Sequence, residues 1–328
     1  MAQSGNEAIA VDSSEAYLQG DGVEEDTQSS TASLTDSIWE YRKLHGRTFN
    51  NFKSGSDYWG PNDELQKEHL DLNHVMLLLA MDNALFFAPL GPKPERVLDV
   101  GTGTGIWAID FANEYPETSV IGTDLSPTQP AWVPPNCKFE IDDASQVPWT
   151  YPDNHFDYIH LRLMLGAIED WGAVYREAYR VLKPGGWIEH SDYEVAVLAD
   201  DASLGPDSPF HQWGPIFYKA GEKTGRTFET MKQAPGLLKE AGFQDLQEKR
   251  LKLPIGSWPA DKKLKNVGNY NLAATEAGLE GFALYLLTQV HGWTAEEAHV
   301  YIEKMRKELR DRSKHPYYVS VSVFAQKA

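Results

Sequence analysis

The chain has 328 residues, 41% of them hydrophobic, and a formal net charge of −18 at pH 7. This length and composition allow a sizeable core, in one large domain with additions or in two small domains. An acidic chain repels phosphate backbones, so nucleic acid is disfavoured as a partner. Asp82 and Asn83 interrupt the longest apolar stretch, residues 74–90, so we expect a buried helix there and no membrane span.

The N-terminal segment differs in composition from the rest. Residues 1–41 contain nine Asp or Glu and no Lys or Arg, and we predict a disordered acidic tail over residues 1–36. The segment lacks the features of a secretory signal, and Cys137 is the only cysteine, so no intrachain disulfide is possible. We therefore expect a cytoplasmic protein, or a nuclear one if it is a regulator. The basic clusters at 262–265 and 306–314 are interpreted as solvated helix faces.

Residues 37–93 bring aromatic side chains and positive charge, and we predict a helical N-terminal cap. Pro61 stands where a helix can begin, and Asp63 and Glu64 suit its positive end. From residue 94, β-rich runs at 96–100, 119–124, 138–144, 156–162 and 185–195 alternate with helical runs at 107–115 and 171–182. This order predicts an α/β fold, a parallel sheet with helices on both faces. A helix at 211–225, a strand-like run at 244–258, a helical block at 261–310 and an alternating run at 317–325 follow.

The first β-rich run ends in the turn D-x-G-x-G-x-G, which spans residues 99 to 105. A dinucleotide-binding turn would need its third glycine at position 106, which is Ile. Glycines here let the backbone bend sharply and approach a ligand without a Cβ in the way. Asp99 can meet a cationic amino group at the end of its strand.

Two more carboxylates follow strand ends. Asp124 is placed to accept hydrogen bonds from ribose hydroxyls, although NAD sites use the same device. Asp143 and Ala144 could bind an adenine amino group and ring nitrogen after the third strand. One amine, one ribose and one adenine, with no phosphate contact, indicate S-adenosylmethionine as the cofactor.

This order of elements resembles the class I methyltransferases over residues 94–258. The resemblance implies a mostly parallel, Rossmann-like seven-stranded sheet and a methyltransferase domain over residues 94–328. It implies that the loop at 101–105 binds the methionine part of the cofactor. The implied cofactor residues are Asp99, Gly101, Thr102, Gly103, Gly105, Asp124, Leu125, Asp143, Ala144, His160 and Arg162.

A narrower resemblance rests on "YWGPNDELQKEHLDLNH", "DVGTGTGIWAID", "IHLR" followed by "DW", and "LKPGGWIE". Together these motifs resemble the fungal LaeA-like methyltransferases, over about residues 37–255. Members of that group act as regulators of secondary metabolism or as tailoring enzymes of biosynthetic clusters.

Methyl transfer is an in-line displacement that depends mainly on alignment, and an oxygen or nitrogen nucleophile can also need a base. The candidate bases are His160, His190 and Glu189, and a structural role is an alternative for each. Aromatic side chains suit a planar acceptor and a sulfonium. The aromatic candidates are Tyr58, Trp59, Trp107, Trp213 and Phe217, of which the last two also read as a normal core stripe. We expect no metal site, because His69 and His74 are five residues apart on a predicted helix.

The main hypothesis is an enzyme that methylates an oxygen or nitrogen of a small fungal metabolite. The alternative is a LaeA-like regulator that works through protein partners. A third possibility is a cofactor-binding fold that catalyses a rearrangement without methyl transfer. The sequence does not define the acceptor or the oligomeric state.

Overall fold

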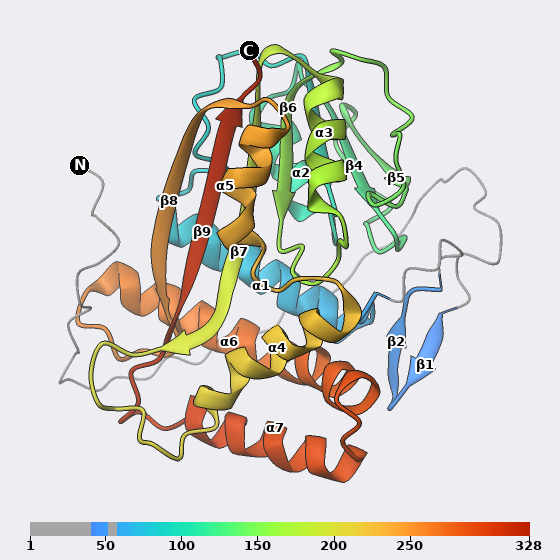
Figure 1. The fold of residues 1–328 in the computed structure, drawn as a ribbon. Helices are drawn as coiled ribbons and strands as arrows, with labels where there is room; N and C mark the ends of the chain where they lie inside the picture. Colours follow the sequence, from blue (N-terminus) through green and yellow to red (C-terminus); the bar gives the residue numbers. More distant parts are fainter. Residues whose placement is uncertain (1–40, 52–57) are drawn as a thin grey trace.

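The computed structural model describes residues 41–51 and 58–328, so the predicted acidic tail lies outside the described residues. Its centre is a seven-stranded sheet with strand order β5-β4-β3-β6-β7-β9-β8 (Figure 1). Neighbouring strands from β5 to β7 are parallel, and β9 runs antiparallel to both β7 and β8. The strands are β3 (Arg96–Val100), β4 (Ser119–Asp124), β5 (Cys137–Ile141), β6 (Phe156–Arg162), β7 (Leu182–Leu198), β8 (Gln244–Pro254) and β9 (Tyr317–Gln326). The predicted fold class is confirmed.

Helices cover both faces of this sheet. α3 (Trp171–Val181) and α5 (Thr230–Glu240) pack together on one face, in front of the sheet in Figure 1. α2 (Ile106–Glu114) packs on the other face against β4 and β5. Strands covered on both faces are buried almost throughout, and most residues of β3 and β6 are buried whichever face they point to.

A separate helical layer lies beyond the carboxyl ends of the parallel strands, below the sheet in Figure 1. It contains α1 (Glu64–Ala80), α4 (Phe210–Thr224), α6 (Lys262–Tyr285), the π-helix η2 (Leu286–Val290) and α7 (Ala295–Leu309). α1 packs along α6, and α6 packs on α7. Asp63 caps α1, accepting the Gln66 N–H at 3.1 Å, and this carboxylate also pairs with Arg47 at 2.5 Å. The helix therefore begins where the sequence predicts.

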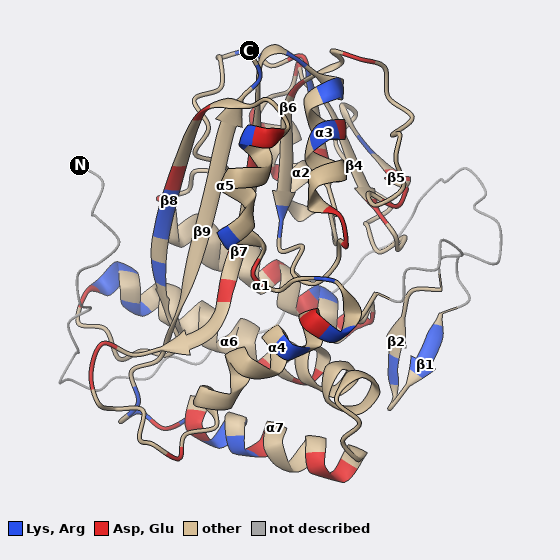
Figure 2. Ribbon diagram, in the orientation of Figure 1, with Lys and Arg blue, Asp and Glu red and all other residues tan. Residues whose placement is uncertain are grey.

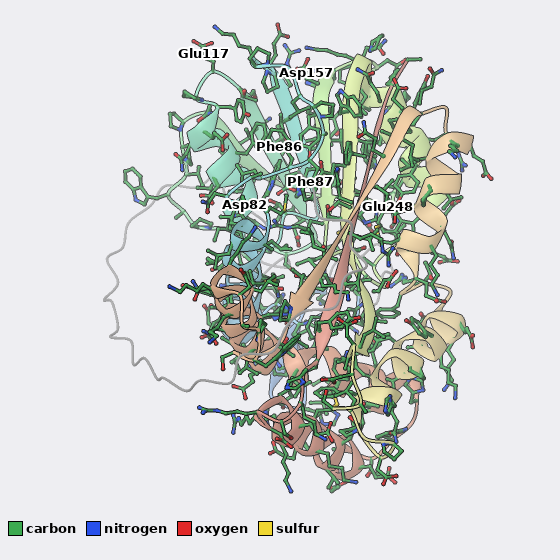
Figure 3. All side chains as sticks on the ribbon, turned by 90° about the vertical axis from the view of Figure 1, so that its left-hand side faces the viewer. Asp82, Phe86, Phe87, Glu117, Asp157 and Glu248 are labelled. Carbon is green, nitrogen blue, oxygen red and sulfur yellow. The ribbon has the colours of Figure 1, made fainter. Side chains whose placement is uncertain are left out.

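The N-terminal cap is less helical than predicted. It opens with a hairpin of β1 (Arg42–Leu44) and β2 (Arg47–Phe49). The buried helix expected over 74–90 ends at Ala80, because Asp82 and Asn83 adopt left-handed φ angles of 57° and 64°. Short polar side chains tolerate that conformation and stop a helix. Figure 3 shows the loop leaving α1 at Asp82 and continuing beside the sheet through Phe86 and Phe87.

Figure 2 shows acidic and basic residues interspersed along α7. The two predicted basic clusters lie at the start of α6 and across the end of α7, and several members pair with acids. Lys263 binds Asp82, and Arg310 binds Glu276, both at 2.6 Å. Within the described ranges, no helix is long and apolar enough to cross a membrane.

Candidate active site

A cavity lies where the carboxyl ends of β3, β4, β5 and β6 face the helical layer. Ligands of open α/β sheets bind at this edge. One part of its lining comes from loops that follow the strands. The other part comes from the segment at 58–62, from α1, from Tyr193 on β7 and from Phe282 on α6.

The glycine turn is shaped by left-handed backbone. Gly101, Gly103 and Gly105 have φ angles of 69°, 59° and 81°, a region that L side chains rarely adopt. A Cβ at Gly101 would lie 2.1 Å from Met164 Sδ, and one at Gly105 would lie 2.3 Å from Phe139 Cζ. The turn is therefore a cradle that only glycine fits.

Asp99 is buried at the end of β3 and lines the cavity. Its carboxylate accepts the Thr102 hydroxyl at 2.5 Å and pairs with His160 Nδ1 at 2.7 Å. Burial lowers the pKa of His160, so the imidazole is neutral and its Nδ1–H donates to Asp99. The His160 ring is stacked on Trp107, with centroids 3.7 Å apart and planes 9° apart.

Asp124 ends β4 and accepts two backbone N–H groups, from Ser126 and Gly103, each at 2.9 Å. Burial raises its pKa to about 6 against the lowering effect of these hydrogen bonds. Asp143 accepts the Ser145 N–H at 2.9 Å and its hydroxyl at 2.7 Å. Leu125, Asp142 and Ala144 line the same part of the cavity.

Arg162 at the end of β6 also lines the cavity and is tied to the cap helix. Its Nη2 donates to His74 Nδ1 at 3.0 Å, and His74 Nε2 bonds Asp110 at 2.8 Å. Burial and the Arg162 charge lower the pKa of His74 to about 4, so His74 is neutral and Nε2 carries the proton. α1 thus fixes the guanidinium beside Asp99.

The opposite wall is aromatic. Tyr58, Trp59 and Phe282 line it together with His69 and Tyr193. Trp59 is 7% exposed, and its Nε1 donates to the Leu165 carbonyl at 2.9 Å. Burial raises the pKa of Tyr58, and burial lowers the pKa of His69 to about 4, so both side chains are uncharged at neutral pH.

Five of the predicted site residues do not line the cavity: Gly105, Glu189, His190, Trp213 and Phe217. Glu189 is 1% exposed and accepts the Phe87 and Ala88 N–H groups at 2.8 Å each, which ties the loop after α1 to β7. His190 is fully buried, bonded to Tyr175 and Asp192 at 2.7 and 3.0 Å. These contacts do not support a role as base for either residue.

Trp213 and Phe217 are 3% and 2% exposed and belong to the core of the helical layer, so they are not acceptor contacts. Trp107 borders the cavity but is 1% exposed, and its Nε1 donates to the Leu85 carbonyl at 2.8 Å. It supports His160 and does not form an aromatic wall for an acceptor.

The sequence analysis missed the polar face of α1. Its members Gln66, Lys67 and His69 line the cavity beside the apolar Leu70, and Asn73 and His74 continue the face behind the wall. Asn62, just before the helix, also lines the cavity. The spacing of the helix residues by three and four was the available signal, because such residues share one side of a helix. Within the described residues, no cluster of three His, Cys, Asp or Glu could hold a metal ion.

Comparison with known proteins identifies the family of this chain. The family described as "Methyltransferase domain" matches residues 72–248. "Methyltransferase pytC" of Aspergillus terreus is 38% identical over 304 residues, 92% of this chain and 93% of that protein. The chain belongs to the LaeA-like methyltransferases.

Two further relatives carry names that refer to regulation or to a protein acceptor. "Secondary metabolism regulator LAE1" of Cochliobolus heterostrophus is 39% identical over 83% of this chain and 90% of its own length. "Protein-methionine methyltransferase laeA" of Emericella nidulans is 32% identical over 85% of this chain and 75% of its own length. The chain is thus an S-adenosylmethionine-dependent methyltransferase with relatives in fungal secondary metabolism.

Proposed function

We propose that this methyltransferase modifies an oxygen or nitrogen atom of a small-molecule intermediate of fungal secondary metabolism. The observation that carries the proposal is the enclosed aromatic wall opposite the glycine turn, formed by Tyr58, Trp59 and Phe282. Small-molecule sites are concave and mostly apolar, with few polar groups. Residues 94–328 would be the catalytic domain, covered by a cap over 37–93 and by the helical block at 261–310.

The residues around the turn fit S-adenosylmethionine. Gly101 and Gly103 bring bare backbone to the cavity wall, and Asp99 and Arg162 offer opposite charges to an amino acid moiety. In the proposed assignment Asp124 holds the ribose hydroxyls. Asp143 with Ala144 binds the adenine, next to Leu125 and Thr102. The cofactor supplies an electrophilic methyl group on a sulfonium that is also the leaving group.

His160 is proposed as a positioning residue. Its Nδ1–H is committed to Asp99, and its ring is held flat against Trp107. The protein's contribution to the reaction is then mainly alignment, which can supply several kcal/mol of the barrier.

The alternative is a LaeA-like regulator that acts on or through a protein. It is supported by the similarity to "Secondary metabolism regulator LAE1" and "Protein-methionine methyltransferase laeA". An enzyme of small metabolites would be cytoplasmic, and a regulator would be nuclear. No nucleic acid or membrane partner is proposed for either, and the oligomeric state is left open.

The test is transfer of labelled methyl from S-adenosylmethionine into an extract of the organism that makes the protein, divided into organic-extractable and protein fractions. Asp124→Asn serves as the matched variant, since it keeps the fold and weakens the cofactor site. Label in the organic fraction that depends on Asp124 supports a metabolite methyltransferase. Label confined to protein contradicts it and favours the regulator.

A further inference from the structure

A line of hydrogen bonds leads from the cavity wall into the helical layer. Tyr193 on β7 lines the cavity, and its Oη lies 2.8 Å from Asn73 Oδ1 on α1. Asn73 Nδ2 lies 2.8 Å from His69 Nε2, one turn earlier on the same helix. His69 Nδ1 lies 2.7 Å from the carbonyl oxygen of Ala274 on α6. The line therefore connects three elements that are far apart in the sequence.

Each hydrogen bond in this line has a fixed direction. The Ala274 carbonyl can only accept, so His69 Nδ1 must carry the proton and donate it. His69 is neutral because burial lowers its pKa to about 4, so Nε2 is an acceptor. Asn73 must then present its amino group to His69 and its carbonyl oxygen to Tyr193. The Tyr193 hydroxyl consequently donates to Asn73.

Burial and packing prevent the Asn73 amide and the His69 ring from turning over, so the donors and acceptors cannot exchange. Asn73 and His69 are 2% and 4% exposed. Asn73 Nδ2 also donates to the backbone carbonyl of His69 at 3.1 Å, which is a second constraint on the amide orientation. A Cβ at Gly278 would lie 2.4 Å from His69 Nδ1, so α6 leaves the imidazole no space to turn.

This arrangement leaves the Tyr193 oxygen with lone pairs and no proton to offer toward the cavity. Arg162 lines the same cavity, beside the glycine turn. We infer that Tyr193 accepts a hydrogen bond from the O–H or N–H group that receives the methyl. The inference rests on the proposed function and narrows it to acceptors whose nucleophilic atom carries a proton.

The same reasoning separates acceptor classes. A hydroxyl or amino group satisfies the Tyr193 oxygen, whereas a thioether such as a methionine side chain offers no proton. An alkylated product has lost the O–H or one N–H, so its contact with Tyr193 is weaker. Tyr193 acts as a positioning residue and not as a base, because the Asn73 amide cannot pass a proton onward.

The experiment uses the unmethylated acceptor and its methylated product, both purified from the organic-extractable fraction of the wild-type labelling reaction. The KM of the acceptor is compared with the inhibition constant of the product. For the wild type we expect the acceptor to be favoured about tenfold, the value of one hydrogen bond. In Tyr193→Phe, the ratio of the product's inhibition constant to the acceptor's KM is expected to fall toward one. The affinity for S-adenosylmethionine is expected to stay unchanged.

Two other variants test the direction of the line. Asn73→Leu frees the Tyr193 proton, which can then donate to the product's ether oxygen, so the preference for the acceptor should shrink although Tyr193 is present. Tyr318→Phe is the matched control, because Tyr318 is stacked on Tyr193 at 6.1 Å but does not line the cavity. Its ratio should equal that of the wild type.

The possible outcomes distinguish a failure of the Tyr193 inference from a failure of the proposed small-molecule methylation. An unchanged ratio in Tyr193→Phe overturns the inference and leaves small-molecule methylation standing. If Tyr193→Phe does not fold, an unchanged ratio in Asn73→Leu overturns it instead. Absence of any organic-extractable product from the wild type overturns the proposed function, and the inference falls with it.

Discussion

The two halves of the cavity are built differently. The half around the glycine turn comes from loops that directly follow β3, β4 and β5, and its carboxylates bond neighbours such as Thr102 and Ser126. The aromatic half is joined by contacts between distant segments, for example Trp59 with Leu165 and His69 with Ala274. We call the half around the glycine turn the local half, because neighbouring residues build it; its cofactor site does not depend on distant segments. The aromatic half is assembled from distant segments, so changes in the N-terminal cap or the helical block can alter its shape.

Trp59→Ala is expected to have the largest effect, and it tests whether the aromatic half can be damaged without loss of cofactor binding. Removing a buried indole that packs on Phe228 and Phe282 should lower the free energy of unfolding by about 3–5 kcal/mol. Methyl transfer should be lost while S-adenosylmethionine binding changes little, as measured by calorimetry beside denaturant unfolding. Trp132→Ala, at a site 77% exposed, is the control. Equal loss of cofactor affinity would show that the halves are not separable.

Gly105→Ala should damage the local half. The left-handed φ of 81° and the overlap with Phe139 should together cost about 3 kcal/mol of stability. Cofactor affinity should also fall at least tenfold, measured by calorimetry at a temperature where the variant is folded. Gly91→Ala is the matched control, since no atom lies within 4 Å of its added Cβ. A Gly105→Ala protein with normal affinity would contradict the cradle.

Asp124→Asn should weaken S-adenosylmethionine binding by about 1.5–3 kcal/mol, the value of hydrogen bonds to a charged group. The wild-type carboxyl has a pKa raised to about 6, so it is protonated below that pH and ionised above it. Wild-type affinity should therefore fall as the pH drops from 7 toward 5, and the Asn variant should lack this step. Asp245→Asn, an exposed change on β8, controls for net charge. A persistent step in Asp124→Asn would assign the titration to another group.

His74→Leu is expected to have the smallest effect. It removes the acceptor of the Arg162 hydrogen bond while leaving the guanidinium in place, so cofactor affinity should fall by about 1–1.5 kcal/mol. Calorimetry across pH 6 to 8 should show no step from His74 in the wild type, because its pKa of about 4 lies below that window. His299→Leu, on the exposed face of α7, is the control. An unchanged affinity would show that the hydrogen bond from α1 to Arg162 does not contribute to cofactor binding.

The local half could be predicted from sequence because one strand and the loop after it contain each of its features. Gly101, Gly103, Asp99 and Asp124 line the cavity, whereas Gly105 lies just behind it. The role of Arg47 with Asp63, or of Asn73 with Tyr193, depends on contacts that only the folded chain brings together. The two members of each pair are far apart in the sequence and follow no regular spacing, so a single sequence does not reveal the contact.

Glu189 and His190 show why the sequence does not tell which polar side chains of a strand reach the cavity. Both belong to β7, an interior strand covered on its two faces, so alternate positions are buried equally. Sequence alternation then does not tell which side chain faces a ligand. The register also matters, since Tyr193, three residues beyond His190, is the β7 side chain that lines the cavity.

The central claim is that the cofactor lies in the local half and presents its methyl group to the aromatic half. The most direct test is a crystal structure of the full chain with S-adenosylhomocysteine. We predict the ribose hydroxyls within hydrogen-bond distance of Asp124 and the sulfur facing the wall of Tyr58, Trp59 and Phe282. A sulfur turned away from that wall, or a ribose bound elsewhere, would contradict the account.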